Sequence, residues 1–216
     1  MSESSSVDLI ERICVSLDVD AKRVLSELAV FEQELVRWQN VKNLVSRETL
    51  PEVWSRHFLD SIQLASLISG KAGVVLDYGS GGGFPAIPIA IVLKETDISV
   101  HMVEANGRKC SFLRHVVRLL DLNCTVHNQR AESLELPENA EVIAITARAF
   151  ADLSKTFEYC ISKFSPETVG FMQKGRGYDE EISASKSDWQ YDLVQHSSVV
   201  AADSVILEIR NLQKRH

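Results

Sequence analysis

The chain has 216 residues, of which 45% are apolar, and a formal net charge of −7. It can therefore bury a full core and fits one domain with an appendage. No apolar run reaches the roughly 18 residues of a membrane span, and the N-terminus lacks the basic and apolar regions of a secretory signal. The negative charge argues against a generic nucleic-acid binder, because phosphate neutralisation dominates that kind of affinity.

The four cysteines are scattered along the chain and form no C-x-x-C pair. Neither a zinc site nor a disulfide framework is therefore predicted. Reduced thiols are typical of a cytosolic protein, so we expect a cytoplasmic chain that holds no metal and contacts no membrane.

The first 70 residues read mostly as helix. After a polar stretch at 1–6 that we expect to fray, Val7–Leu17 fits a short helix and about Ala21–Val41 a longer one. The longer helix carries an apolar stripe that we interpret as core packing, formed by Leu25, Leu28, Phe31, Leu35 and Trp38. A capping-box pattern at Thr49–Glu52 predicts a third helix. Its inward residues are expected to be Trp54, Phe58, Ile62 and Ala65.

We predict an N-terminal helical segment over 1–70, packed on a second domain over 71–216. In that domain strand-like and helix-like runs alternate, which predicts an α/β fold with a mostly parallel sheet and helices on both faces. The predicted strands are 74–76, 98–103, 124–127, 142–146 and 168–173, and the predicted helices lie near 86–94, 107–121, 151–164 and 179–187. Residues 191–195 and 204–210 are expected to close the sheet as an antiparallel pair.

Ligands of such sheets bind at the carboxyl ends of the strands. We therefore expect the functional residues at these ends, where they can converge on one crevice. The segments concerned are 77–84, 104, 128–132, 146–150 and 173–175.

The first of these strand ends, in VVLDYGSGGGFPAIP, reads as a buried strand, a glycine-rich turn and the start of a helix. Glycine adopts positive φ and lets a ligand approach the backbone. The G-x-G-x-x-G pattern of dinucleotide sites fails here, because Phe84 stands in place of its third glycine. The pattern D-x-G-x-G-x-G resembles the first motif of methyltransferases that use S-adenosylmethionine (SAM), and it fits at Asp77, Gly79, Gly81 and Gly83. A tight turn without a ligand is the alternative.

Glu104 follows the second predicted strand, 25 residues after Gly79. This spacing is near the roughly 20 residues between a glycine turn and a ribose-binding acid. An ionised carboxylate only accepts hydrogen bonds and suits a vicinal diol, so we interpret Glu104 as a ribose ligand. A solvated glutamate at a strand end is the alternative.

Basic residues gather locally despite the net charge. Each cluster is either a nucleic-acid contact or an ordinary solvated face. The clusters are Arg108 and Lys109 within the acid-free stretch 107–118, Lys174 with Arg176, and Arg210, Lys214 and Arg215 in the tail.

Several further motifs accompany the glycine turn. They are Trp38-Gln39-Asn40, Asn43-Leu44, Arg56-His57-Phe58-Leu59-Asp60-Ser61, Glu104 with Arg108-Lys109 and Phe112-Leu113, Arg130-Ala131-Glu132, Arg148-Ala149-Phe150 and Lys174-Gly175. Together with LDYGSGGGFPAIP they resemble the glucose-inhibited division protein B family over nearly the whole chain. Two residues depart from the family pattern: Ala86 replaces a usual glycine, and Arg108 replaces a common lysine.

This family consists of bacterial SAM-dependent methyltransferases that modify guanine N7 in 16S ribosomal RNA near the decoding site. The resemblance implies a Rossmann-like, class I methyltransferase sheet with an N-terminal helical extension. It also implies SAM as the methyl donor, S-adenosylhomocysteine as the product and 16S ribosomal RNA or the small ribosomal subunit as the partner. We expect the protein to act as a monomer.

The resemblance further implies cofactor-binding residues. Those expected to contact SAM are Gly79 and Phe84 at the turn, Ala131 and Glu132 at the adenine, and Arg148 near the methionine end or the incoming base, with Asp77, Gly81, Gly83 and Glu104 lining the pocket. Glu132 has an alternative as a charge favoured at a helix N-terminus, and Arg148 as a structural salt bridge. His57 and Asp60, which share a helix face, either shape the pocket or serve packing or capping.

Guanine N7 has a lone pair and no proton to lose, so we expect an in-line displacement without a general base, driven by positioning. No residue is assigned as catalytic, although Arg148 and Lys174 are candidates. Aromatic and arginine side chains hold exposed bases in RNA-binding proteins. The expected RNA contacts are Arg108, Lys109, Phe150, Lys174 and Arg176.

Three other functions stay open. A nicotinamide dehydrogenase shares the fold but lacks its third glycine here. A non-catalytic RNA- or ribosome-binding module needs basic surface but no intact pocket. A methyltransferase acting on a small molecule or a protein is the third, and the local basic clusters weakly favour RNA over it.

Overall fold

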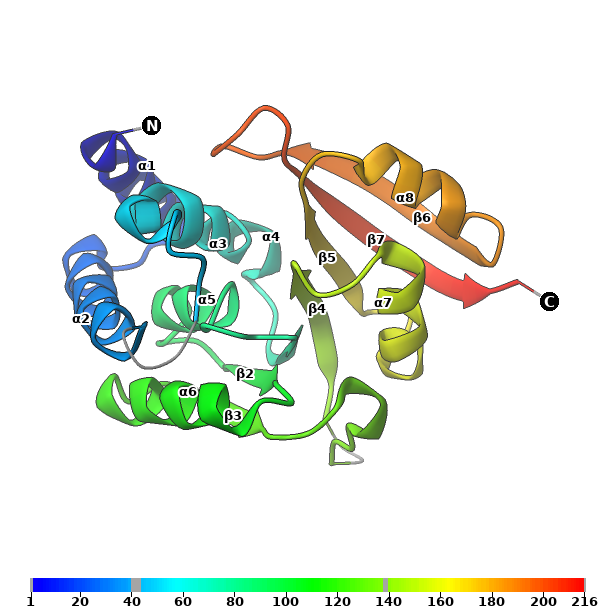
Figure 1. Ribbon diagram of the computed structural model, residues 1–216, viewed down its shortest axis with the longest axis horizontal. Helices are drawn as coiled ribbons and strands as arrows, with labels where there is room; N and C mark the ends of the chain where they lie inside the picture. Colours follow the sequence, from blue (N-terminus) through cyan, green and yellow to red (C-terminus); the bar gives the residue numbers. More distant parts are fainter. Residues whose placement is uncertain (1, 40–43, 138–139, 216) are drawn as a thin grey trace.

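The computed structural model describes residues 2–39, 44–137 and 140–215. Its centre is a seven-stranded sheet in the order β3-β2-β1-β4-β5-β7-β6 (Figure 1). The strands are β1 (Gly73–Tyr78), β2 (Ile98–Val103), β3 (Cys124–His127), β4 (Val142–Arg148), β5 (Val169–Lys174), β6 (Trp189–Ser197) and β7 (Val205–Lys214). The α-helices are α1 (Glu3–Ser16), α2 (Ala21–Gln39), α3 (Asp60–Ile62), α4 (Ala65–Ile68), α5 (Ala86–Val92), α6 (Gly107–Leu119), α7 (Leu153–Cys160) and α8 (Tyr178–Ser185). Short 3-10 segments are η1 (Leu50–Glu52), η3 (Ala131–Ser133) and η4 (Ile161–Lys163), and η2 (Trp54–Leu59) is π-helical.

Strands β1 to β5 are parallel, so their carboxyl ends lie at one edge of the sheet. β7 is antiparallel to both β5 and β6 and lies between them. The predicted mostly parallel sheet with a closing antiparallel pair is therefore confirmed. No helix in the described parts of the chain is both long and apolar enough to cross a membrane.

Alternation along the strands sends side chains into two cores, one on each face of the sheet. In β1, Val75 packs into the core shared with α2, α5 and α6, while Leu76 and Tyr78 pack into the core shared with α7. Helices α1, α2 and α3 lie on the same side of the sheet as α5 and α6 (Figure 1), and α2 and α3 contact α5 directly. The N-terminal helices thus form an outer layer on one face.

Phe31 of α2 connects this outer layer to the glycine turn. Its ring centroid lies 5.3 Å from that of Phe84 in the turn, 5.6 Å from Phe58 in η2 and 6.2 Å from Phe112 in α6. All four rings are buried, and burying each contributes about 1.5–3 kcal/mol. The N-terminal helices therefore share a core with the sheet, although our division of the chain at residue 70 stays a prediction.

The expectation that residues 1–6 fray is wrong for the described part, because residues 3–6 belong to α1. Ser2 caps the helix, and its Oγ accepts a hydrogen bond from the Ser5 N–H at 3.2 Å. Ser6 is fully buried, and its hydroxyl donates to the Ser2 carbonyl at 3.1 Å. A serine cap and one buried serine thus hold a polar sequence in helical form.

The capping box expected at Thr49 is also wrong. Thr49 has helical dihedrals and makes no capping hydrogen bond, because its hydroxyl contacts Ser46 and the His57 ring. The predicted third helix is instead a succession of the short elements η1, η2, α3 and α4. The residues expected to turn inward are nevertheless buried: Trp54, Phe58, Ile62 and Ala65.

Two further helix ends differ from the prediction. The helix expected over 151–164 consists of α7 followed by the 3-10 segment η4. The long N-terminal helix is described up to Gln39, and the expected continuation to Val41 lies outside the described residues.

Gln39, the last residue of α2, fastens the segment that covers the glycine turn. Its buried Oε1 accepts hydrogen bonds from the Leu44 and Val45 N–H groups at 2.8 and 3.1 Å, and its Nε2 donates to the Val45 carbonyl at 2.8 Å. The Leu44 carbonyl lies so close to Gly82 that a Cβ there would be 2.9 Å from it. The motif residues Asn40 and Asn43 lie outside the described residues.

Replacing Gln39 should therefore destabilise the protein. Gln39→Ala leaves two N–H groups without their acceptor, so we expect the free energy of unfolding to fall by about 1–3 kcal/mol in urea denaturation. The matched control is Gln33→Ala, an exposed position on the same helix, for which we expect a change within about 0.5 kcal/mol. Equal effects of the two variants would contradict the role assigned to Gln39.

Candidate active site

A cavity of about 1270 Å³ opens where the carboxyl ends of the parallel strands meet. Its walls come from the glycine turn, the ends of β4 and β5, residues 44–60 and residues 200–204. The predicted site residues that line it are Gly79, Gly81, Phe84, Lys109, Arg148, Phe150, Lys174 and Arg176. The predicted site residues outside its lining are Asp77, Gly83, Glu104, Arg108, Ala131 and Glu132.

The glycines of the turn have different surroundings. Gly79 and Gly83 both have positive φ, +71° and +92°, a conformation that L side chains rarely adopt. The Phe150 ring packs directly on Gly79, so that a Cβ there would overlap it. A Cβ on Gly83 would lie 2.7 Å from Ile87 in the core. Gly79 therefore serves the cavity, and Gly83 serves the packing of the helix that follows.

Asp77, the penultimate residue of β1, lies beneath this turn and is fully buried. Its Oδ1 accepts a hydrogen bond from the Thr146 hydroxyl at 2.7 Å, whereas its Oδ2 has no partner among the described residues. Burial raises the pKa of Asp77 to about 7, although hydrogen bonds from Ser80 and Thr146 oppose the shift. An unpaired buried oxygen is costly. Asp77 lies outside the cavity lining, so its contact with SAM stays a prediction.

Glu104 bridges the turn and the next strand ends. One carboxylate oxygen accepts from the Gly81 N–H at 2.9 Å, and the other accepts from the Asn106 N–H at 2.7 Å. The Asn128 side chain, beyond β3, donates to the Glu104 carbonyl at 3.2 Å. Glu104 is thus more than a solvated strand end, while its contact with a ribose stays a prediction.

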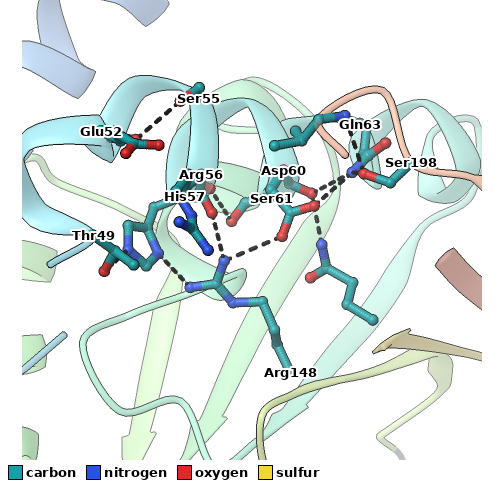
Figure 2. A network of polar contacts seen from close by, with 12 residues as sticks. Thr49, Glu52, Ser55, Arg56, His57, Asp60, Ser61, Gln63, Arg148 and Ser198 are labelled. Carbon is teal, nitrogen blue, oxygen red and sulfur yellow. Dashed lines mark hydrogen bonds and ion pairs between the residues drawn. The ribbon is translucent and has the colours of Figure 1, made fainter. Parts of the chain in front are cut away.

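Arg148, the last residue of β4, is the centre of a polar network (Figure 2). Its Nη2 donates to His57 Nδ1 at 2.6 Å, and its Nη1 donates to the Arg56 carbonyl at 3.1 Å and to Asp60 Oδ2 at 3.2 Å. The guanidinium also lies 5.2 Å from the centre of the Phe84 ring. Arg148 therefore forms the structural salt bridge considered from the sequence and lines the cavity as well.

His57 serves this network in its neutral form. Because Nδ1 accepts from Arg148, the ring proton is assigned to Nε2, which donates to Thr49 Oγ1 at 2.9 Å. Burial, reinforced by the charges of Arg148 and Arg56, lowers the pKa of His57 to about 3. At neutral pH His57 therefore positions its neighbours and is poorly suited to transfer protons.

Two glutamine side chains extend the network to other elements. Gln173 of β5 donates to the Asp60 carbonyl at 2.7 Å, and Gln63 donates to Asp60 Oδ1 at 2.9 Å. The side-chain Oε1 of Gln63 accepts a hydrogen bond from the Val199 N–H at 3.1 Å. Segment 54–63 is thereby tied to two strand ends and to the loop between β6 and β7.

Lys174 and Arg176, the two basic residues near the end of β5 that were predicted to contact RNA, each form an ion pair within the protein. Lys174 Nζ donates to Glu181 Oε2 at 2.6 Å and to the Ala151 carbonyl at 2.7 Å, and its side chain is only 13% exposed. Arg176, which is 88% exposed, pairs with Asp203 at 2.7 Å. Lys174 thus holds the loop that carries Phe150, and its predicted role toward RNA stays a prediction.

The remaining predicted residues lie around the same edge of the sheet. Arg108 and Lys109 begin α6, where the Asn106 side chain accepts from both of their N–H groups. Ala131 and Glu132 form η3, after the end of β3. Among the described residues, no three His, Cys, Asp or Glu side chains gather as a metal ion would require.

Part of the cavity wall consists of residues that were not predicted from the sequence. The polar run SRET at 46–49, separated by six residues from the motif at 56–61, was an available signal for the first group, the residues missed in segment 46–55. The second group comes from a hairpin loop whose sequence carries no comparable signal. The first group is Ser46, Thr49, Glu52 and Ser55, and the second is Val200, Ala201, Asp203 and Ser204. Val45, Ala151, Asp152 and Glu181 were missed as well.

The neutral state of His57 predicts a dependence of stability on pH. With a folded-state pKa of about 3 and an unfolded value of about 6.5, the unfolded chain binds more protons between these limits. Stability is therefore lost as pH falls below about 6.5. Between pH 7.5 and 5.0, we expect the unfolding free energy of the unmodified protein to drop by about 2 kcal/mol more than that of His57→Gln in urea titrations. Parallel pH curves would contradict this assignment.

Comparisons with known proteins agree with this geometry. The GidB family model, described as rRNA small subunit methyltransferase G, matches residues 24–212. A relative named ribosomal RNA small subunit methyltransferase G from Sinorhizobium medicae is 43% identical over 200 residues, which cover 90% of this chain and 92% of that protein. Proteins of the same name from Rhizobium meliloti and Bartonella henselae are 42% and 40% identical, covering 92% and 89% of those proteins and 90% and 89% of this chain.

Solved structures show the same fold at low sequence identity. An O-methyltransferase from Bacillus cereus, in complex with SAH, gives a TM-score of 0.56 at 16% identity and covers 84% of this chain and 91% of that one. A SAM-dependent methyltransferase from Aquifex aeolicus gives the same score and identity, covering 74% of this chain and 92% of that one.

The expected class I methyltransferase sheet is confirmed, and the alternative functions of a nicotinamide dehydrogenase and of a non-catalytic RNA-binding module are rejected. The chain belongs to the GidB family, rRNA small subunit methyltransferase G, and is a methyltransferase.

Proposed function

We propose that this protein transfers the methyl group of SAM to N7 of one guanine in 16S ribosomal RNA, near the decoding site. One observation carries the proposal: the glycine turn and basic side chains of distant elements face the same cavity. Its volume of about 1270 Å³ exceeds the roughly 300–1,000 Å³ of an ordinary small-molecule pocket. It is large enough for the methyl end of SAM and a nucleotide, while we assign the ribose and the adenine to residues just beyond its lining. The choice of guanine N7 and of the decoding site rests on the motif resemblance.

The residues around the turn fit SAM. Asp77 Oδ2, which lacks a partner among the described residues, is an acceptor suited to the ammonium of the methionine part. Each oxygen of Glu104 accepts one backbone N–H, so each keeps a lone pair for a ribose hydroxyl. Gly79 allows close approach to the backbone. We assign the adenine to Ala131 and Glu132 in η3.

The reaction does not require the protein to transfer a proton. SAM would supply an electrophilic methyl group on a sulfonium: the N7 lone pair would bond to the methyl carbon as the carbon–sulfur bond opposite it breaks, and S-adenosylhomocysteine would leave. No general base is needed, and we do not assign that role to His57. The contribution of this chain is positioning. Arg148 fixes one wall of the cavity, and Lys174 holds the loop after β4 so that Phe150 lies against the turn.

Phe150 is the aromatic surface that we assign to the target base. Its ring is half-buried in the cavity wall, next to Tyr78 and Tyr159, with centroids 6.1 and 5.5 Å away. Stacking on an aromatic ring is a common way to hold an unstacked RNA base. All the residues assigned here come from one chain, so we take the monomer as the working unit and the small ribosomal subunit or its RNA as the partner.

Methyl transfer from labelled SAM to small ribosomal subunits tests the function directly. The subunits come from a strain that lacks the enzyme, and mass mapping locates the product. We expect a single N7-methylguanine near the decoding site, and no product when 7-deazaguanine replaces that base. Label on another atom, on a protein or on no component of the subunit would contradict the proposal.

The SAM side of the cavity has its own test. Gly79→Ala adds a Cβ at positive φ that overlaps the Phe150 ring, so we expect SAM affinity in calorimetry to fall about tenfold or more. Gly70→Ala is the control, because Gly70 also has positive φ, +85°, but no atom lies within 4 Å of the added Cβ. We expect it to lose some stability but to bind SAM normally. Equal SAM affinity of the two variants would place SAM elsewhere.

A further inference from the structure

Most charged side chains that line the cavity are already satisfied by the protein. Three ion pairs join cavity-lining residues: Arg148 with Asp60, Lys174 with Glu181, and Arg176 with Asp203. The Asp152 carboxylate caps α7 by accepting from the Lys155 N–H at 2.8 Å. These groups shape the wall and are not free to meet a ligand without losing a partner.

Three other charged side chains that line the cavity have no such partner among the described residues. Within the described residues, the charged groups of Glu52, Arg56 and Lys109 take part in no hydrogen bond or ion pair. Glu52 and Arg56 are four residues apart, a spacing that on an α-helix favours an ion pair. They stand instead on a 3-10 and a π-helical segment, and they form no pair. Glu52 is thus a cavity-lining carboxylate whose two oxygens have no partner in the part of the chain that the structure describes.

The backbone that carries Glu52 is held in place. Its N–H donates to the Thr49 carbonyl at 3.1 Å, and its carbonyl accepts from the Ser55 hydroxyl at 3.2 Å, as Figure 2 shows. Thr49 in turn hydrogen-bonds to His57 within the Arg148 network. These hydrogen bonds fix the backbone from which the Glu52 side chain extends, and a fixed support is one requirement of specific recognition.

Attack through N7 does not by itself select guanine, because adenine has an N7 lone pair too. The two bases differ at the Watson–Crick edge, which lies away from N7 and which base-flipping enzymes commonly read. Guanine presents the donors N1–H and N2–H₂ there, whereas adenine presents the acceptor N1. A carboxylate only accepts hydrogen bonds, so it matches guanine and opposes the adenine N1 lone pair.

We propose that Glu52 determines the base specificity of this enzyme by accepting hydrogen bonds from N1–H and N2–H₂ of the target guanine. This inference rests on the proposed function. We assign Arg56 and Lys109, the two cavity-lining cations without a partner among the described residues, to RNA phosphates, where they give affinity without base selection.

The test compares guanine with inosine, which lacks only the N2 amino group. Small ribosomal subunits are reconstituted with either base at the mapped position, and kcat/KM is measured with labelled SAM. For the unmodified protein, inosine should lower kcat/KM about 10- to 100-fold, because a hydrogen bond to a charged group is lost. For Glu52→Ala, activity on guanine should fall by at least this factor, because both hydrogen bonds are lost, and the preference for guanine over inosine should collapse to about one.

Matched variants separate recognition from damage to the fold. Glu48→Ala removes an exposed carboxylate from the same segment outside the cavity, and it should keep both activity and preference. Arg56→Ala should lower kcat/KM equally for both bases and reduce its dependence on salt. Glu52→Gln, which keeps one acceptor and the side-chain shape, should give an intermediate preference.

The possible outcomes distinguish a failure of the proposed function from a failure of the role assigned to Glu52. If the unmodified protein methylates no guanine, the proposed function is overturned and this inference falls with it. If it methylates guanine N7 but Glu52→Ala keeps the full preference over inosine, only the role of Glu52 is overturned.

Discussion

The guanidinium of Arg148 joins the parts of the molecule that enclose the cavity. It ends a central strand, yet its partners His57, Asp60 and the Arg56 carbonyl all belong to the helical segment before the sheet. A buried cation without such partners costs several kcal/mol, so the strand end and the helices stabilise each other. The N-terminal helices are therefore a wall of the site as well as a layer of the fold.

The cavity divides its charges between structure and recognition. The ion pairs of Arg148, Lys174 and Arg176 set the positions of the strand ends and loops. Asp77 Oδ2 has no partner among the described residues, and Glu52 is likewise unengaged within them. We connect the first with SAM and the second with the base. The buried Asp77 oxygen reduces stability in the absence of a ligand, as is common where a site is built for binding, whereas the exposed Glu52 carboxylate is hydrated.

Much of the fold could be predicted from the sequence because its signals are local. The strands at 98–103 and 124–127 have the predicted bounds, and the glycine turn stands where its spacing placed it. The capping box that was predicted wrongly depends on a contact outside its own local pattern. Thr49 resembles a helix cap, but its hydroxyl is taken by His57, eight residues later. The partners of Lys174 and the loop near Val199 are likewise set by tertiary packing, which no local pattern reveals.

A double-mutant cycle measures the central interaction most directly. Arg148→Met, Asp60→Asn and the double variant are compared with the unmodified protein by urea denaturation at pH 7.5. If Arg148 and the N-terminal helices stabilise each other as described, the coupling energy should be about 2 kcal/mol or more. Effects that add within about 0.5 kcal/mol would show that the strand end and the helical segment are energetically independent.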